Sequence, residues 1–349
     1  MGMESPHESS LEYNEGGDMI TSAEVKEVAR GFGADLVGIG DIRRFEGVPA
    51  LRDPRHVAPA AKSVIGLGFR VLRGSLRGVE EGTQFYQFSQ MGVVGIDERI
   101  APDVLRRVAC HLEDNGYEGV VQRAEPDRRP ASDTGANPEL RATHKINARP
   151  VAPGRPPPDV VMDFNVAAYV CGLGEIGEGG FFLTPEFGPL QRFAFILTDA
   201  ELEPDPIYAG QRMCDRCGEC ATACPGKAII GGERTRRSVN GSVVESAALD
   251  EWQCLAYYMG AHAGSNPFLP PGAYDGIPDG GSVARGERRL APDEVERLKP
   301  ILGAAYAGMN FGYNACVCGK ACQRACLAAL ERRGVLRKRF KTPFRKAVG

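Results

Sequence analysis

Four closely spaced cysteines constrain this 349-residue chain more than any other feature. They lie in the stretch Cys214-Asp-Arg-Cys217-Gly-Glu-Cys220-Ala-Thr-Ala-Cys224-Pro225, a C-x2-C-x2-C-x3-C-P pattern. Where two cubes are bound, this spacing wraps three thiolates around one [4Fe–4S] cluster and sends the fourth to a second cluster. The pattern therefore predicts two iron–sulfur clusters. A tetrahedral zinc site, which is also built from C-x2-C pairs, is the alternative.

A second set of cysteines near the end of the chain can supply the remaining ligands. Two cubes need eight thiolates, and the same crossover of ligands predicts how they divide. One cube takes Cys214, Cys217, Cys220 and Cys326, and the other takes Cys224, Cys254, Cys322 and either Cys316 or Cys318. We favour Cys318 because it is nearer to Cys322. Cys110 and Cys171 lie in apolar contexts and are predicted to be small buried side chains.

Composition places the chain among ordinary soluble proteins. A quarter of its residues are charged and the net charge is −3, which argues against a general nucleic-acid binder. No run of eighteen apolar residues is present, so we expect no membrane span. Residues 1–20 carry no export signal, and the clustered cysteines indicate reduced thiols, so we expect a cytoplasmic protein.

The order of apolar patterns predicts a layered α/β (α+β) domain. A capping box at Thr21 opens a helix, and a second amphipathic helix is expected over 102–114. Strands are expected over 35–40, 63–71, 118–122 and 193–199, and the apolar stretch 160–171 should enter the core. The predicted parts are a disordered tail (1–20), an α/β domain (21–205), a ferredoxin-like two-cluster domain (206–331) and a solvated basic tail (332–349). Residues 124–158 form a long functional or mobile loop.

A glycine-rich stretch follows the apolar segment. Gly172-x-Gly174-x-x-Gly177 matches the dinucleotide fingerprint by letters, but that motif needs a helix after it. Gly179, Gly180 and the prolines beyond them argue against a helix there. The glycines are better suited to close backbone approach to a large flat cofactor.

Three side chains are candidates for reductive chemistry. Arg192, at the start of a core strand, is either a surface cation or a group that holds an anionic leaving group or polarises a proton donor. Tyr169 and Asp163 are either proton donors or core residues with satisfied partners.

The motifs together resemble the superfamily of reductive dehalogenases and epoxyqueuosine reductases, over about residues 20–330. The resemblance rests on the opening helix, on the two cysteine sets and on five short segments. These segments are Ala34-Asp-Leu-Val-Gly-Ile39, Ala60-Ala-Lys-Ser-Val-Ile65, Gly172-Leu-Gly-Glu175, Leu183-Thr-Pro-Glu-Phe-Gly-Pro189 and Leu197-Thr-Asp199. The third and fourth look closer to the dehalogenase branch.

The resemblance implies a corrinoid (cobalamin) in a nitroreductase-like domain, near Gly172, Gly174 and Glu175, with two [4Fe–4S] clusters feeding electrons to cobalt. It implies a small-molecule substrate and an electron donor such as ferredoxin or flavodoxin. Arg192 matches the cation that assists the family's proton donor. The loop expected to carry the donor tyrosine has none, and Tyr169 is its substitute here. Asp163 is the corresponding candidate under the epoxyqueuosine reading.

The expected function is reductive cleavage of a carbon–halogen or carbon–oxygen bond. Two alternatives stay open. One is an epoxyqueuosine-reductase-like enzyme that modifies tRNA, and the other is a two-cluster electron-transfer protein without catalysis of its own.

Overall fold

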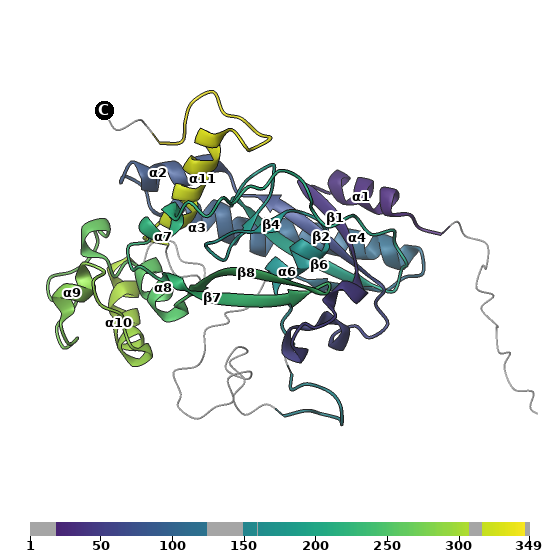
Figure 1. Cartoon of the computed structure of the whole chain (residues 1–349), viewed down its shortest axis with the longest axis horizontal. Helices are drawn as coiled ribbons and strands as arrows, with labels where there is room; N and C mark the ends of the chain where they lie inside the picture. The colour runs from purple at the N-terminus through teal and green to yellow at the C-terminus, as the bar shows by residue number, and fades with distance from the viewer. Residues whose placement is uncertain (1–18, 124–148, 159, 307–315, 346–349) are drawn as a thin grey trace, which may run out of the picture.

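The structure is a computed structural model, and it describes residues 19–123, 149–158, 160–306 and 316–345. Helices and strands alternate in the first part of the described chain, and helices dominate its last part (Figure 1). The strands are β1 Leu36–Asp41, β2 Ser63–Arg70, β3 Gly119–Gln122, β4 Glu175–Ile176, β5 Phe182–Leu183, β6 Gln191–Thr198, β7 Ile229–Val239 and β8 Ser242–Leu249.

Most helices of the described residues are short. The α-helices are α1 Ser22–Gly31, α2 Arg77–Glu80, α3 Tyr86–Ser89, α4 Ala101–Asp114, α6 Phe164–Val170, α7 Glu219–Thr222, α8 Glu251–Tyr258, α9 Gly280–Ala284, α10 Pro292–Ala305 and α11 Ala321–Arg333. The 3-10 turns are η1 Ile42–Phe45, η2 Ala50–Arg52, η3 Pro54–His56, η4 Arg73–Leu76 and η7 Ala263–Ser265, and η5 Gln90–Val94 and η6 Ile96–Ile100 are π-helical.

A four-stranded antiparallel sheet forms the centre of the fold. Its strand order is β1-β2-β6-β3, with Ile65 of β2 opposite Ile196 of β6. β2 is buried along nearly its whole length, which shows that both faces of the sheet are covered. The predicted strands and the two long predicted helices are all present, and the mixed helix-and-strand fold class is confirmed.

Different helices cover the two faces of this sheet. α1 and α4 share one hydrophobic core with Ala194 and Ile196 of β6. α6 packs on the opposite face, in a core that contains Phe195 and Leu197. Since side chains alternate along a strand, Arg192 projects from the same face as Ala194 and Ile196.

Glycines let α6 approach the sheet closely. A Cβ on Gly38 of β1 would lie 2.2 Å from the carbonyl oxygen of Cys171, and one on Gly40 would lie 2.6 Å from the Val170 side chain. Cys171 itself is buried, as predicted, and Cys110 is half-buried. The end of α6 is therefore pressed against β1, and this contact positions the glycine-rich stretch that follows.

The cysteine-bearing part of the chain packs directly on this domain. Met213, Leu327 and Leu330 belong to the same core as α1 and α4, so packing continues across the boundary predicted at 205/206. The unpredicted hairpin β7–β8 contacts α6 and β4. A separate core joins α8 and α10. The described chain contains no helix that has both the length and the apolar character needed to cross a bilayer.

The basic segment at the end of the described chain keeps most of its charged side chains exposed, but it is attached to the fold near its end. Phe344 is 1% exposed, its N–H donates to Glu331 at 3.0 Å, and Arg77 donates to its carbonyl oxygen at 2.7 Å. Burial of Phe344 thus holds against the fold a segment whose cations remain in solvent. At the other end, Ile20 is buried, while residues 1–18 and most of the predicted 124–158 loop lie outside the described ranges.

Candidate functional site

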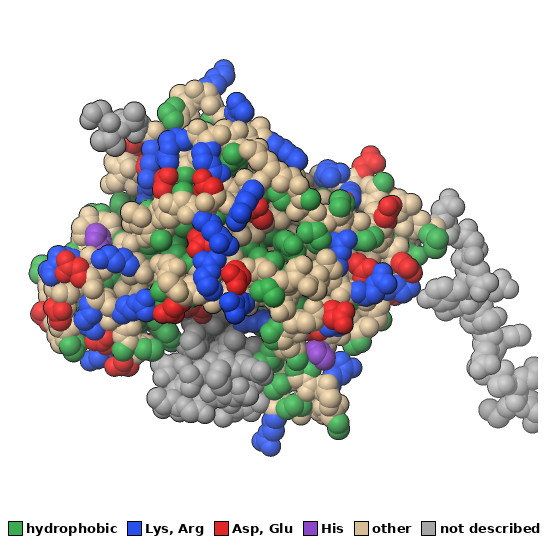
Figure 2. Space-filling view, in the orientation of Figure 1, with side chains coloured by type: hydrophobic (Ala, Val, Ile, Leu, Met, Phe, Trp, Pro, Cys, Tyr) green, Lys and Arg blue, Asp and Glu red, His purple; other side chains and the backbone are tan. Residues whose placement is uncertain are grey.

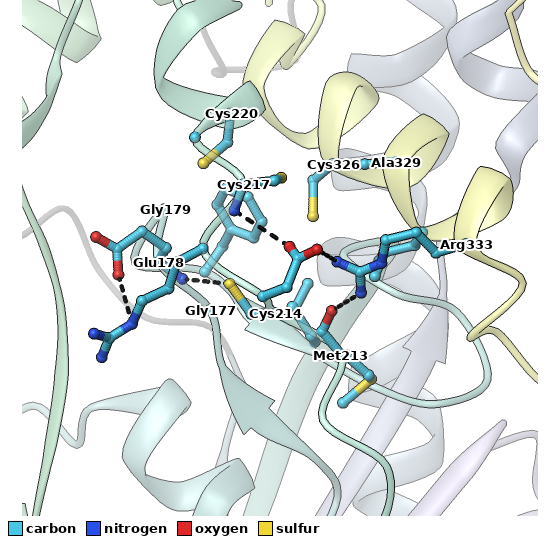
Figure 3. A pocket seen from close by; sticks show the side chains of 16 residues that line it. Gly177, Glu178, Gly179, Met213, Cys214, Cys217, Cys220, Cys326, Ala329 and Arg333 are labelled. Carbon is cyan, nitrogen blue, oxygen red and sulfur yellow. Dashed lines mark hydrogen bonds and ion pairs between the residues drawn. The ribbon is translucent and has the colours of Figure 1, made fainter.

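Four cysteines, Cys214, Cys217, Cys220 and Cys326, line one pocket (Figure 3). Cys214 and Cys217 come from the loop that leads into α7, Cys220 lies in α7, and Cys326 comes from α11, which packs against α7. Sequence spacing predicted this group of four, and the fold brings its distant member, Cys326, to the other three.

The glycine-rich stretch holds the loop on which these thiols lie. The Glu175 carboxylate accepts hydrogen bonds from the backbone N–H groups of Cys214, at 2.6 Å, and Met213, at 3.1 Å. The backbone N–H of Glu178 donates to the Cys214 sulfur at 3.2 Å. Such N–H···S bonds stabilise a thiolate and tune the potential of a cluster that it binds.

Gly172 and Gly174 have no room for side chains. Gly172 has φ +70°, and a Cβ there would lie 2.3 Å from the Pro206 carbonyl oxygen; one on Gly174 would lie 2.0 Å from that of Leu183. The chain continues into the hairpin β4–β5, so the prediction that no helix follows is confirmed. Gly172, Gly174 and Glu175 thus contact the protein's own backbone here, and the structure gives them a role beside the first cysteine set.

The second group of cysteines also gathers. The Cys322 thiol lies close enough to Cys224, Cys254 and Cys318 to interact electrostatically with each. Burial raises the pKa of Cys254 to about 11 and that of Cys322 to about 12. The backbone N–H of Ala228 donates to the Cys224 sulfur at 3.3 Å. Cys224 therefore lies with the second set rather than with its sequence neighbours, as the crossover pattern requires.

The two candidates for the eighth ligand differ in their surroundings. A hydrogen bond from Cys316 is the largest cause that lowers the pKa of Cys318, and the backbone N–H groups of Lys320 and Ala321 lower it further. Burial raises the pKa of Cys316. Cys318 is therefore the more readily ionised thiol of the pair. This agrees with its choice as ligand, and that choice stays a prediction.

The chemistry of the two groups fits iron–sulfur cubes. All eleven cysteines lie in described residues and are free thiols. In the part of the chain that the structure describes, no three His, Cys, Asp or Glu side chains converge on a single ion. A cube binds each thiolate through a different iron, so its ligands stand apart around a cavity, as the first group does. Cys326 also interacts with Cys322, which puts the two groups next to each other.

Arg192 is held by a buried carboxylate. Its Nε donates to Asp97 at 2.9 Å, and a second nitrogen completes a two-point ion pair. Asp97 is 3% exposed at its side chain and lies on the π-helical stretch η6. π-Helical turns are frequent at functional sites. The Arg192 side chain is 39% exposed, and Asp97 orients its guanidinium.

Tyr169 and Asp163 do not lie with Arg192. Both belong to α6 or its N-cap, on the other face of the sheet. Asp163 accepts the N–H groups of Asn165 and Val166 as the cap of α6, and it pairs with Arg237 at 3.3 Å. Tyr169 lines an open pocket of about 620 Å³ that also contains Glu175 and Cys214. The fold therefore separates the predicted donors from the predicted cation.

Three further residues lie at the site and belong to none of the motifs recognised in the sequence. Tyr258 of α8 interacts with Arg192 and also with Cys316 and Cys318, and burial raises its pKa. Arg333 donates to the Met213 carbonyl oxygen and pairs with Asp215 beside the first pocket. Glu178 pairs with Arg234, with one contact at 3.0 Å. Motif spacing predicts the ligands, whereas tertiary packing brings these three residues next to them.

Comparison with known proteins gives matches of partial length. No protein-family model matches the chain. Tetrachloroethene reductive dehalogenase of Dehalobacter restrictus is 36% identical over 121 residues, which cover 34% of this chain and 20% of that protein. The enzyme of the same name from Sulfurospirillum multivorans is 40% identical over 100 residues, or 26% of this chain and 19% of that protein. Epoxyqueuosine reductase of Gloeobacter violaceus is 34% identical over 94 residues, or 26% of this chain and 24% of that protein.

The chain is homologous to reductive dehalogenases and epoxyqueuosine reductases. This confirms the resemblance read from the motifs, and the names of the relatives slightly favour the dehalogenase branch. These relatives are oxidoreductases by name. The homologue described here spans about a fifth of the length of the curated dehalogenases it matches.

Solved structures of both kinds are similar to this homologue. A reductive dehalogenase whose structure is described as suggesting a mechanism for B12-dependent dehalogenation has a TM-score of 0.49 at 16% identity, and the match covers 94% of this chain and 40% of that one. Epoxyqueuosine reductase from Streptococcus thermophilus has a TM-score of 0.40 at 15% identity, and the match covers 89% of this chain and 81% of that one.

Proposed function

We propose that this protein is a corrinoid-dependent iron–sulfur reductase of the reductive-dehalogenase type, acting on a small molecule. The observation that carries the proposal is the assembly of eight cysteines into two neighbouring groups of four, packed against an α+β domain. A bare electron carrier has no need of such a domain before its clusters.

Each group of thiols would hold one [4Fe–4S] cluster. Cys214, Cys217, Cys220 and Cys326 would bind the first in the pocket that they line, and Cys224, Cys254, Cys318 and Cys322 would bind the second. When bound, the clusters supply one-electron transfer at low potential. Since the eight thiols must stay reduced, a reducing compartment such as the cytoplasm is part of the proposal.

The reaction that fits these groups is a two-electron reduction. Two electrons and one proton replace the halogen of a carbon–halogen bond by hydrogen and release a halide ion. Carbon–oxygen cleavage by two electrons and one proton releases an alkoxide or hydroxide ion, and a second proton from solvent converts it to an alcohol or water. The electrons come from an external one-electron carrier protein.

Arg192 is the side chain we assign to the developing negative charge. Asp97 fixes its orientation before any substrate arrives, and a preoriented cation stabilises charge without reorganisation. Tyr169 and Asp163 lie across the sheet from it, so neither is its partner in this proposal.

The corrinoid rests on the relatives alone. When bound it supplies a reducible cobalt. Gly172, Gly174 and Glu175, which the motifs suggested as its binding residues, instead contact the protein's own backbone.

Anaerobic reconstitution with iron, sulfide and cobalamin tests the proposal. We expect about eight irons per chain, a bound corrinoid, and spectra that change on reduction. Release of halide from a panel of halogenated substrates would establish the reaction. Zinc in place of iron would contradict the clusters, and eight irons without corrinoid would leave the electron-transfer alternative.

A tRNA-modifying role is the second candidate. Homology to epoxyqueuosine reductases and the exposed basic residues that follow α11 favour it. Binding of a tRNA stem-loop that weakens steeply with salt would support this role.

A further inference from the structure

One ligand of the first cluster group lies at the surface. Cys217 is exposed, whereas Cys220 is buried and Cys214 and Cys326 are partly buried. The proposed first cluster is therefore the one that an outside electron carrier can approach. Electrons would enter at the cluster of Cys217 and pass to the cluster of the second group, because Cys326 interacts with Cys322. The second group lies toward Arg192, since Tyr258 interacts with Arg192 and with Cys318.

Positive charge surrounds this entry point. We define the basic face as the cations of the first cysteine loop and of residues 332–341. They are Arg212, Arg216, Arg332, Arg333, Arg337, Lys338, Arg339 and Lys341. Figure 2 shows Lys and Arg side chains gathered over the end of the molecule where Figure 1 places α11 and the segment after it.

Contacts tie the two parts of the basic face together. Arg332 of α11 pairs with Glu219, two residues after Cys217, and Arg333 pairs with Asp215. Arg332, Lys338, Arg339 and Lys341 line one open groove of about 1330 Å³. The buried Phe344 holds the end of this segment through hydrogen bonds with Arg77 and Glu331, and Arg333 at the end of α11 lines the cysteine pocket.

The basic face carries an excess of positive charge. Its eight cations are set against four carboxylates, Glu178, Asp215, Glu186 and Glu219, which leaves an excess of four. The whole chain has a net charge of −3, so this face differs in sign from the average of the molecule. Such an asymmetry attracts a partner of the opposite sign and raises its association rate.

We infer that the basic face is the docking surface for an acidic, one-electron carrier protein, which delivers electrons through Cys217. The inference rests on the proposed function. Electron-transfer encounters use small interfaces and depend on charge for their rate, which matches a polar face that lacks a large apolar patch. Phe340 is the large apolar side chain exposed here, and the Arg73 guanidinium covers its ring at 3.7 Å.

A charge-reversal variant tests the inference on the reconstituted holoenzyme. Lys338→Glu, Arg339→Glu and Lys341→Glu are combined, because these side chains are exposed and none of them lines the cysteine pocket. Stopped-flow spectroscopy measures reduction of the clusters by a reduced acidic plant-type ferredoxin. We expect the second-order rate constant to fall at least about tenfold at low salt, with the difference shrinking as salt screens the charges.

Two controls separate docking from cluster loss. Reduction by titanium(III) citrate and the iron content should match the wild type. The matched variant Arg30→Glu, Arg99→Glu and Arg106→Glu reverses three exposed arginines on α1, η6 and α4, and it should keep the wild-type rate with ferredoxin.

Several results would overturn the inference. An unchanged ferredoxin rate in a fully loaded basic-face variant overturns docking and leaves the proposed function standing. Loss of salt-sensitive tRNA stem-loop binding together with that unchanged rate assigns the face to nucleic acid instead. Failure of the wild-type chain to take up iron overturns the proposed function and this inference with it.

Discussion

The Glu175 carboxylate lies 2.6 Å from the backbone nitrogen of Cys214 and accepts its hydrogen bond. The same oxygen also accepts the N–H of Met213, so one side chain of the β4–β5 hairpin fixes the first turn of the cysteine loop. The glycine-rich stretch and the first cluster group are therefore one structural unit.

Glu175→Ala should loosen this unit. Two backbone donors lose a charged acceptor, and each such hydrogen bond contributes about 1.5–3 kcal/mol. We expect a lower midpoint of thermal unfolding and loss of part of the iron from the first cluster. Glu175→Gln keeps an oxygen acceptor, so its iron content and unfolding midpoint should lie between those of the wild type and of Glu175→Ala. Iron analysis and the thermal unfolding curves check this, and full iron retention in Glu175→Ala would contradict it.

Single cysteine replacements should remove one cluster at a time. Cys326→Ser removes a ligand of the first group and Cys322→Ser one of the second, so each should lower the iron content from about eight to about four per chain. The electron paramagnetic resonance spectra of the two reduced variants should differ. Cys110→Ser, at a half-buried site on α4, is the control and should keep all the iron.

Replacing Cys316 and Cys318 one at a time should show which of the two thiols is the cluster ligand. Cys318→Ser should lose iron, because Cys318 is the thiol that its surroundings favour in the ionised form. Cys316→Ser should keep it. The reverse result would move the ligand to Cys316 and would contradict the assignment made from nearness to Cys322.

Glu294 should make stability depend on pH. The hydrogen bonds from Arg288, at 2.9 and 3.0 Å, are the largest cause that lowers the pKa of Glu294 below its usual 4.5. Because its pKa is lower in the folded chain than in the unfolded chain, the ionised carboxylate stabilises the fold at pH values above the unfolded-state pKa. This stabilisation is lost as the pH falls through the folded-state pKa.

Glu294→Gln should therefore be less stable than the wild type at pH 7, by about 2 kcal/mol, and the difference should shrink as the pH falls below 4.5. Chemical denaturation between about pH 3.5 and pH 7 measures it. A difference that stays constant over this range would show that the charge of Glu294 is not the cause. Glu287→Gln, at an exposed ion pair, is the control and should change little.

Phe344 should anchor the C-terminal segment. The side chain is 1% exposed, so Phe344→Ala should cost about 3 kcal/mol and make the segment after α11 sensitive to protease. Phe340→Ala is the matched control, because that ring is 51% exposed and its contact with Arg73 is worth about 0.5–1 kcal/mol. Equal protease resistance of the two variants would contradict the anchoring role.

The helices and strands of the central sheet could be read from local patterns. Thr21 caps α1 as its capping box indicates, and the fully apolar run of β2 is buried on both faces, because periodicity and caps act over a few residues. The β7–β8 hairpin was missed since its strands carry many charges and little alternation. The attachment of the basic segment was missed because the burial of Phe344, rather than the net charge of the segment, holds it against the fold.

The sequence by itself predicted the eight thiol ligands and their division into two groups, because the spacing of a short loop limits how many sulfurs can face one cluster. Only the tertiary structure decided which side chains surround these thiols and Arg192. It brought Cys326 on α11 to the loop of Cys214, gave Glu175 to that loop, and put Arg192 with Asp97 on the sheet face opposite Tyr169. Contacts between residues far apart in the chain depend on how helices and strands pack, and no local pattern encodes that packing.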